Sequence, residues 1–347
     1  MRRLIYIFII GLLLCSYTWA DGSRYASKSL LSEGKWVKIR VDKTGIYKLS
    51  YADLKNMGFS DPSKVSVHGY GGWPLDEDFS KEYIDDVPST PVWRGSDYLL
   101  FYGKGPVKWE YDSSSQTFVH TNNPYSLYGY YFVTDATPTN DMTSVAQASG
   151  ATNRITTYDD YLVHEQELVS LAKSGRELYG EDFSGATPRT LSTFSSIPGI
   201  TNEDAKVTMS FVSKVTSGTG VASLSINQSN VLDVSIRSNR EEYVKALEGV
   251  STAVWKGEKS EKNSVVVSYN SASHNNVRLN YVRLHFKRTL QPYGAYTFFR
   301  SIASIGNVSR FVVQGANANT LVFDVTDAQR VRLMETELNG SELTFSI

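Results

Sequence analysis

Residues 36–49, WVKIRVDKTGIYKL, decide the fold class of this chain, because they have the pattern of two β-strands around a turn. From Trp36 to Val41 apolar and basic side chains alternate with a period of two, which indicates a half-buried strand. The next four residues begin with Asp42 and end with Gly45, the composition of a type I turn. The chain then resumes as a strand, so the stretch predicts a β-hairpin.

Outward from this stretch, the sequence predicts one short helix and a run of short strands. Ser50 can cap a helix over residues 51–57, with Asp53 in its first turn and Gly58 as its end. Turn residues separate the apolar segments at close spacing, as in antiparallel sandwiches and barrels. The predicted strands of this block are residues 65–70, 98–102, 107–111, 117–120 and 128–133.

A second block begins near Leu191 and is also strand-like. Its strands are predicted at residues 207–212, 222–227, 231–236, 264–269 and 277–288, with spacing that suits a jelly-roll-like sandwich. Residues 158–179 are charged and lack a clear period, so strand, helix and crossover all stay open for them. Residues 311–313, 321–325, 331–334 and 343–347 return to strands.

The predicted fold class is therefore mostly β, with two or more antiparallel sandwich or jelly-roll-like domains and one or two short helices. We expect a signal peptide at 1–20, an N-terminal β domain at 21–170 and a second β-sandwich at 171–290. Residues 291–347 would either return to the first domain or lead to a missing downstream catalytic domain. Because the sequence stops within a predicted strand, we expect the chain to be a fragment of something longer.

The first twenty residues have the features of a secretory signal. Arg2 and Arg3 precede an apolar stretch, and Thr18 and Ala20 are small residues at the cleavage positions. The one cysteine, Cys15, lies in this segment, so the mature chain should contain no thiol. With 35 Lys and Arg against 36 Asp and Glu, and no basic stripe, nucleic acid is a poor partner. The protein is therefore expected to be exported.

No set of residues in the sequence assembles an active site. The histidines are His68, His120, His164, His274 and His285, and none has a second histidine or a cysteine at metal-ligand spacing. His285 is expected at the surface or rim of a sheet. His164, which precedes Glu165 and Glu167, is expected in a solvated charged stretch rather than a proton relay. Serine-nucleophile and phosphate-loop motifs are absent. The sequence therefore predicts no catalytic, cofactor-binding or metal-ligating residue.

Calcium is the one cofactor for which residues can be suggested. Calcium takes six to eight oxygen ligands. An acidic run that could supply them consists of Asp76, Glu77, Asp78, Glu82, Asp85 and Asp86. Its spacing is not that of an EF-hand, so a loop that binds nothing is the stronger expectation.

Eight strings in order resemble one family over nearly the whole mature chain. They are GKWVKIRVDKTGIYKLSYADL from Gly34, VHGYGG from Val67, YIDDVP from Tyr83, DYLLFYGKGPVKWEYD from Asp97, HTNNPYSLYGYYFVTD from His120, SGRELYGEDF from Ser174, LNYVRLHFKRTL from Leu279 and VFDVTD from Val322. Together they resemble the N-terminal, non-catalytic region of the cell-surface sortases of the type IX secretion system, which are gingipain-family cysteine peptidases of the Bacteroidetes.

The resemblance implies a function and partners. Such proteins remove the C-terminal signal of secreted cargo and attach the cargo to the cell surface, together with an outer-membrane shuttle protein. Their catalytic histidine and cysteine lie in a gingipain-like domain downstream of the region matched here, so no catalytic residue is carried over. The resemblance implies transport through the periplasm to the outer membrane and cell surface. The alternative is a stand-alone surface β-sandwich that binds glycans or acts as an adhesin.

Overall fold

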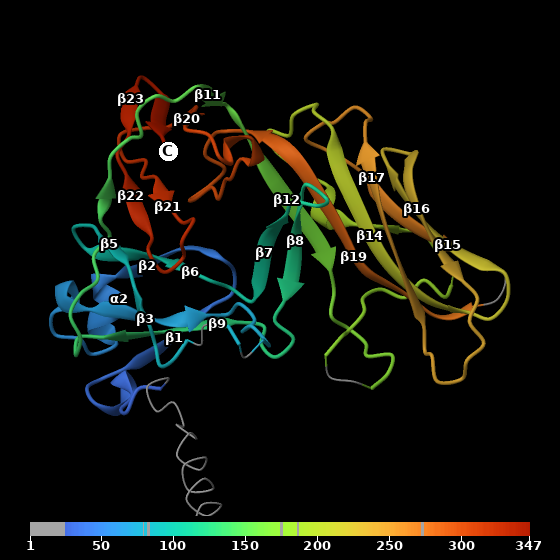
Figure 1. Ribbon diagram of the computed structural model, residues 1–347, viewed down its shortest axis with the longest axis horizontal. Coiled ribbons are helices and arrows are strands. Elements are labelled where there is room, and N and C mark those ends of the chain that lie inside the picture. The colour runs from blue at the N-terminus through green and yellow to red at the C-terminus, as the bar shows by residue number, and fades with distance from the viewer. Residues whose placement is uncertain (1–24, 79, 82–83, 174–175, 186, 272–273) are drawn as a thin grey trace, which may run out of the picture.

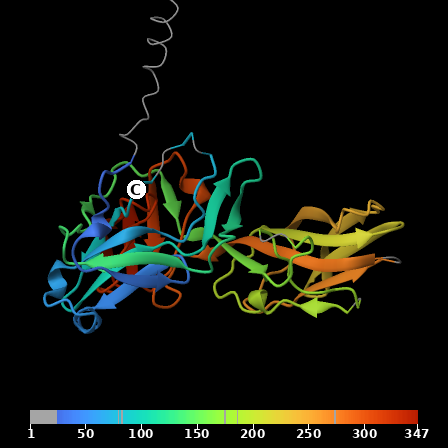
Figure 2. The same ribbon diagram turned by 90° about the horizontal axis from the view of Figure 1, so that it is seen from below.

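The computed structural model describes residues 25–347, apart from 79, 82–83, 174–175, 186 and 272–273. It is mostly β, with many short antiparallel sheets and little helix, which confirms the predicted fold class. The expected signal peptide, including Cys15, lies outside the described residues. No helix among the described residues is long and apolar enough to cross a membrane. Both views place one β-sandwich at one end of the long axis and the remaining sheets at the other (Figure 1) (Figure 2).

The first lobe is built from two small sheets. One has the strand order β1 (Val37–Val41), β9 (Gly129–Thr134), β3 (Ser66–Gly71), β4 (Ser89–Thr90), and the other has β2 (Gly45–Ser50), β6 (Tyr98–Gly103), β5 (Val92–Arg94). Apolar side chains from both sheets form its core, among them Val41, Val67, Phe101 and Tyr131, each at most 1% exposed. The core thus lies between the two sheets.

The predicted hairpin at residues 36–49 is wrong in its pairing, although both strands form. β1 pairs with β9 and β2 pairs with β6, so the chain changes sheet between them. The Tyr47 hydroxyl lies at this corner, where it accepts from the N–H of Asp42 and of Lys43 and donates to the Lys43 carbonyl. The Tyr47 ring stacks on Phe101 at 5.6 Å. Tyr47 therefore fixes the corner by contacts that alternation along the sequence cannot reveal.

The predicted helix forms as α2 (Tyr51–Asn56). The Ser50 hydroxyl accepts from the N–H of Asp53, and Gly58 follows with a positive φ of 88°, as a helix end requires. Leu54 is its buried residue and packs into the first core. Four short 3-10 helices complete the helical content of the described chain: η2 (Leu30–Ser32), η3 (Pro62–Lys64), η4 (Ser192–Phe194) and η5 (Ile302–Ser304).

The second lobe is a sandwich of two four-stranded sheets. The first sheet has the order β12 (Thr157–Glu165), β19 (His274–Thr289), β14 (Ala205–Val215), β17 (Leu247–Trp255). The second has the order β13 (Arg189–Thr190), β18 (Val265–Asn270), β15 (Thr219–Ile226), β16 (Ser229–Arg237). Alternate side chains of β14, such as Val207, Met209 and Phe211, are at most 1% exposed and form the largest core with the facing sheet.

A third group of strands joins distant parts of the chain. One sheet has the order β11 (Asn153–Ile155), β20 (Ser309–Val313), β24 (Glu342–Ser346), β23 (Glu337–Asn339). The other has the order β10 (Ser144–Val145), β22 (Arg332–Met334), β21 (Phe323–Asp324). β11 and β20 pair in parallel, so the whole second sandwich is an insertion between two neighbouring strands. Stacked Phe311 and Phe345 rings lie in this group's own core.

These pairings shift the boundary expected at residue 170. β12 is an edge strand of the second sandwich, so the chain enters that sandwich at Thr157. The sequence did not decide the secondary structure of residues 158–179, and residues 158–165 of this segment are strand. The segment after β19 pairs with β10 and β11 rather than with the sheets of the first lobe, and it touches that lobe where Phe298 meets Tyr102.

Candidate functional site

A two-stranded hairpin connects the first lobe with the second sandwich. It consists of β7 (Val107–Asp112) and β8 (Thr117–Asn122), and it lies between the two lobes (Figure 1). The Trp109 ring from β7 stacks on the Tyr161 ring of β12, with centroids 3.7 Å apart and planes 15° apart. Phe118 from β8 meets His285 of β19 edge to face at 5.5 Å. We call this contact region between the lobes the joint.

A histidine of the hairpin completes a buried polar contact in the joint. His120 Nε2 lies 2.8 Å from a Glu165 carboxylate oxygen, and Arg283 Nη1 lies 3.3 Å from His120 Nδ1. A guanidinium can only donate, so Nδ1 of His120 accepts and its Nε2–H donates to Glu165. The neutral imidazole in this one tautomer therefore links β8 to β12 and β19.

Two consecutive aspartates of β12 hold the segment that leaves the second sandwich. Asp159 is 2% exposed and accepts from His285 Nε2 at 3.2 Å, Lys287 Nζ at 2.9 Å and the Ile302 N–H at 2.7 Å. Burial alone would raise the pKa of Asp159, but the hydrogen bonds from His285, Ile302 and Lys287 together hold this pKa below its usual value. Asp159 is therefore a charged carboxylate at neutral pH.

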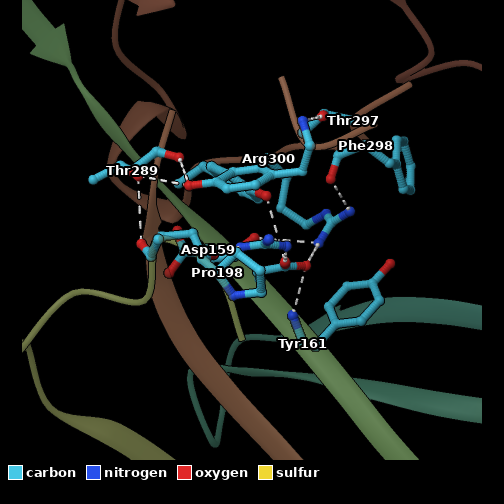
Figure 3. A network of polar contacts seen from close by, with 12 residues as sticks. Asp159, Tyr161, Pro198, Thr289, Thr297, Phe298 and Arg300 are labelled. Atoms are coloured by element: carbon cyan, nitrogen blue, oxygen red, sulfur yellow. Dashed lines mark hydrogen bonds and ion pairs between the residues drawn. The ribbon is translucent and has the colours of Figure 1, made fainter. Parts of the chain in front are cut away.

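Asp160 forms the other half of this network, of which Figure 3 labels Asp159, Tyr161 and Arg300. Its carboxylate accepts from Arg288 Nη1 at 2.9 Å and from Arg300 Nη1 at 3.4 Å. The Arg300 guanidinium also lies 4.1 Å from the centre of the Tyr161 ring. Because Arg300 comes after β19, the network fastens the C-terminal segment to β12 as well as to the hairpin.

An open pocket of about 340 Å³ lies at the joint. Asp159, His285 and Lys287 line it, together with Asp204, Lys206 and the start of η5. Lys206 donates to the carbonyls of Ser115 and Gln116 in the hairpin turn. Asp159, His285, Lys287 and Lys206 are all engaged in such contacts, so the arrangement is suited to holding segments in place.

The structure corrects two expectations about histidines. His285 is 9% exposed and paired with Asp159, so it is not at a surface or rim. His164 is also 9% exposed and hydrogen-bonded to Thr193 Oγ1 and Glu181 Oε1, at 2.8 and 2.6 Å, so its side chain is not solvated, although residues 166–169 are exposed. In both cases the partner is distant in the sequence or lies in the segment without period.

The other two histidines and the acidic run lie outside the joint and have partners of their own. His68 lies in the first lobe beside Thr137 and Ser66, and His274 lies beside the carbonyls of Ser184 and Ser271. Asp76 pairs with Lys81 at 2.5 Å, and Asp86 accepts from Ser29 and Leu30. Glu82 lies outside the described residues. Among the residues described, no group of three acidic, histidine or cysteine side chains could hold a metal ion.

A groove lies at one end of the second sandwich, between β16 and β17. Its volume is about 660 Å³, and its lining includes Asn227, Asn230, Val254 and Trp255. Trp255 is only 4% exposed, so its ring offers no open face on which a sugar could stack.

Sequence reasoning considered His120 and His285 but did not single out Asp159 and Asp160, which lie beside aromatic residues in the sequence. Two adjacent carboxylates flanked by Tyr158 and Tyr161 were the available signal, because charges in a buried strand need partners. The site is therefore a buried, cross-linked joint, and the class of protein that it defines is a multi-sandwich β scaffold.

Comparisons with known proteins extend this assignment. No family model matches the chain, and a search of curated proteins finds no match. The crystal structure of dimeric latent PorU from Porphyromonas gingivalis aligns with a TM-score of 0.86 and 30% identity, over 93% of this chain and 31% of that one. BuGH86 in complex with neoagarooctaose aligns with 74% of this chain and 32% of that one, at TM-score 0.21 and 10% identity, and carries no argument.

The resemblance drawn from the eight strings is thereby confirmed, since this chain has the fold of a region of PorU over nearly its whole length. The chain spans about a third of the length of that PorU chain.

Proposed function

We propose that this chain is the N-terminal structural and docking region of a PorU-like surface sortase of the type IX secretion system. The observation that supports this most is the match to PorU over 93% of the chain. The buried joint supports a structural role, because a scaffold that orients other domains must keep its own lobes at a fixed angle. Catalysis would then reside in a gingipain-like cysteine peptidase domain of the longer protein.

In this proposal the region works with three partners. It supports the downstream catalytic domain, contacts the outer-membrane shuttle protein, and lies close to the cargo whose C-terminal signal is removed. A cysteine peptidase needs a thiolate nucleophile, and the only cysteine here is Cys15 in the expected signal peptide. The catalytic thiol must therefore come from elsewhere, and the protein acts at the cell surface after export.

The test is to loosen the joint in the whole gene. Replacing Asp159 by alanine should reduce processing of the cargo's C-terminal signal in cells. The matched control is Asp76→Ala, which removes an exposed ion pair with Lys81 and should leave processing unchanged. Immunoblots against the peptidase show whether the protein is still made and exported. Cleavage of a cargo peptide by the purified 347-residue chain alone would refute the proposal.

A second candidate, a stand-alone glycan-binding sandwich, has the groove between β16 and β17 in its favour. A glycan array on the purified chain separates the two readings. Specific binding that Asn230→Ala abolishes would favour the second, and an array without signal would leave the first.

A further inference from the structure

Lys104 is a buried lysine that has no carboxylate paired with its ammonium among the described residues. It follows β6 directly and is 4% exposed. The acidic side chain that acts on it from a distance is Asp327, whose carboxylate pairs with Arg330 at 2.6 Å instead. The other charge that acts on it is the ammonium of Lys108, which has the same sign. A buried ammonium in this position loses hydration without gaining an ion pair.

Two aromatic rings and a fixed backbone hold Lys104 in this place. Its Nζ lies 4.0 Å from the centre of the Tyr70 ring and 5.1 Å from the centre of the Trp73 ring. The N–H of Lys104 donates to the Tyr131 hydroxyl at 2.9 Å, and its carbonyl accepts from the Gly72 N–H at 2.8 Å. Ring faces attract a cation, but they carry no net charge. The surroundings therefore position the amine without neutralising it.

The amine nitrogen of Lys104 still reaches solvent. It makes no hydrogen bond to another described residue. Within the described part of the chain, the fully enclosed side-chain atoms without a hydrogen-bond partner belong to Arg94, Glu181, Arg283 and Ser301, and Lys104 Nζ is not one of them. An atom that has no partner and is not enclosed touches water. A small reagent can therefore meet the nitrogen, although most of the side chain is covered.

Lys259 is buried in a similar setting but is hydrogen-bonded. It is 8% exposed, and its Nζ lies 4.9 Å from the centre of the Trp255 ring. Unlike Lys104, it donates to the Gly257 carbonyl at 3.1 Å. Burial lowers the pKa of both amines, and that of Lys104 falls to about 8. At pH 7.5 about a quarter of the Lys104 amines are then uncharged, against about a thousandth for an ordinary lysine.

We propose that Lys104 is a nucleophilic amine at which this chain accepts a small acyl group from an acyl phosphate. The ammonium first loses a proton to water. Nζ then forms a bond to the acyl carbon, the bond from this carbon to the phosphate oxygen breaks with its electron pair, and Nζ releases a second proton. The product is an uncharged amide, which burial favours over the ammonium, whereas methylation would keep the charge in place. The inference does not depend on the proposed function.

Acetyl phosphate at a limiting concentration tests the proposal on the purified, folded chain. Mass spectrometry of proteolytic peptides gives the acetylation rate of each lysine. At pH 7.5 Lys104 should react about ten times faster than Lys48, since its larger uncharged fraction is offset only in part by the weaker nucleophilicity of a weaker base. Lys48 is the matched control, because it is exposed and lies 4.0 Å from the centre of the Tyr98 ring. In urea, where the chain is unfolded, the two rates should become similar.

The pH dependence of the rates shows whether the surroundings of the amine are the cause. The rate at Lys104 should level off above about pH 8, while exposed lysines such as Lys48 react faster up to pH 10. Trp73→Ser uncovers the ammonium, so the rate should level off at a higher pH, and an unchanged circular dichroism spectrum shows that the variant folds. If it does not fold, the wild-type profile decides.

Two results would overturn the proposal. One is a folded chain in which Lys104 is acetylated no faster than Lys48 at pH 7.5. The other is a rate at Lys104 that keeps rising to pH 10. A folded Trp73→Ser variant whose rate levels off at the same pH as the wild type would overturn the part assigned to the rings.

Discussion

The Trp109 indole stacks on the Tyr161 ring at 3.7 Å, and the Arg300 guanidinium lies 4.1 Å from the same ring. These three residues come from the hairpin, from β12 and from the segment after β19. The Tyr161 ring, itself on β12, therefore contacts the other two segments that pass between the lobes.

Removing the indole should loosen the hairpin. We expect Trp109→Ala to lower the free energy of unfolding by about 1–3 kcal/mol, because a stacked aromatic pair and its buried area are lost. Urea unfolding measures the loss, and limited proteolysis should cut the hairpin between Asp112 and Thr117 sooner. Trp109→Phe keeps a stacked ring and should lose less than half as much. Equal losses in the two variants would show that stacking contributes little.

Removing the Asp159 carboxylate should be more severe. Asp159→Ala leaves His285, Lys287 and the Ile302 N–H without their shared acceptor in a buried site, and we expect a loss of about 3–5 kcal/mol. Asp76→Ala removes an ion pair of exposed side chains and should change the free energy of unfolding by less than about 1 kcal/mol. Thermal and urea unfolding of both variants provide the comparison.

Asp159 should also make the free energy of unfolding depend on pH in the acid range. Its pKa in the folded state is held below that of an unfolded aspartate, so its contribution is present above the unfolded pKa and is lost as the pH falls through the folded one. The difference in unfolding free energy between the wild type and Asp159→Asn should therefore shrink as the pH drops below about 4. A difference that stays constant from pH 7 to pH 3 would contradict this assignment.

The stability of the corner between β1 and β2 should depend on the Tyr47 hydroxyl. Tyr47→Phe keeps the ring stacked on Phe101 but leaves the N–H groups of Asp42 and Lys43 without their acceptor. We expect a loss of about 1–2 kcal/mol in unfolding free energy. Tyr125→Phe, at a tyrosine that is 81% exposed, should change stability by less than about 0.5 kcal/mol. A neutral Tyr47→Phe would mean that water replaces the hydroxyl.

A buried lysine predicts a pH dependence of the same sign in an alkaline window. Lys104 is 4% exposed, with its ammonium 4.0 Å from the centre of the Tyr70 ring, and burial lowers its pKa to about 8. In the unfolded chain its pKa is the ordinary 10.5. The unfolded chain thus binds more protons between these values, so stability contributed by Lys104 rises with pH through this window.

The measurement is a comparison of variants between pH 7 and pH 10. Lys104→Met should be more stable than the wild type at pH 7, and the gap should narrow as the pH rises above 8. Above pH 10 the tyrosines intervene, since burial raises the pKa of Tyr131 to about 12 and its ionisation opposes folding. Lys48→Met, at an exposed lysine 4.0 Å from the Tyr98 ring, controls for the lost ring contact. A gap that widens with pH would refute the prediction.

Local signals in the sequence predicted the elements better than their pairing. Ser50, Asp53 and Gly58 fix α2 through contacts within a few residues, and alternation fixes the long strands. Sheet membership depends on partners far along the chain, which is why β1 and β2 were expected to pair with each other. β17 was not predicted, because its inner positions Gly249, Ser251 and Ala253 are too small to give an apolar alternation.

The contacts of the joint could not be predicted from the sequence for the same reason. Asp159 and His285 are 126 residues apart, and only the register of β12 with β19 brings them together. His164 stands next to Glu165 in the sequence, yet successive side chains of a strand point to opposite faces. His164 therefore bonds to Glu181, while Glu165 meets His120 from the hairpin.

The parallel pair of β11 and β20 frames the second sandwich without separating it from its host. The chain leaves the pair after Ile155 and returns to it at Ser309, and β12 and β19 run side by side between these points. Tyr158, at the start of this insertion, and Leu290, which follows β19, belong to the core of the β11–β20 group. A change at the base of the inserted sandwich is therefore also a change in the core of the strands that hold it.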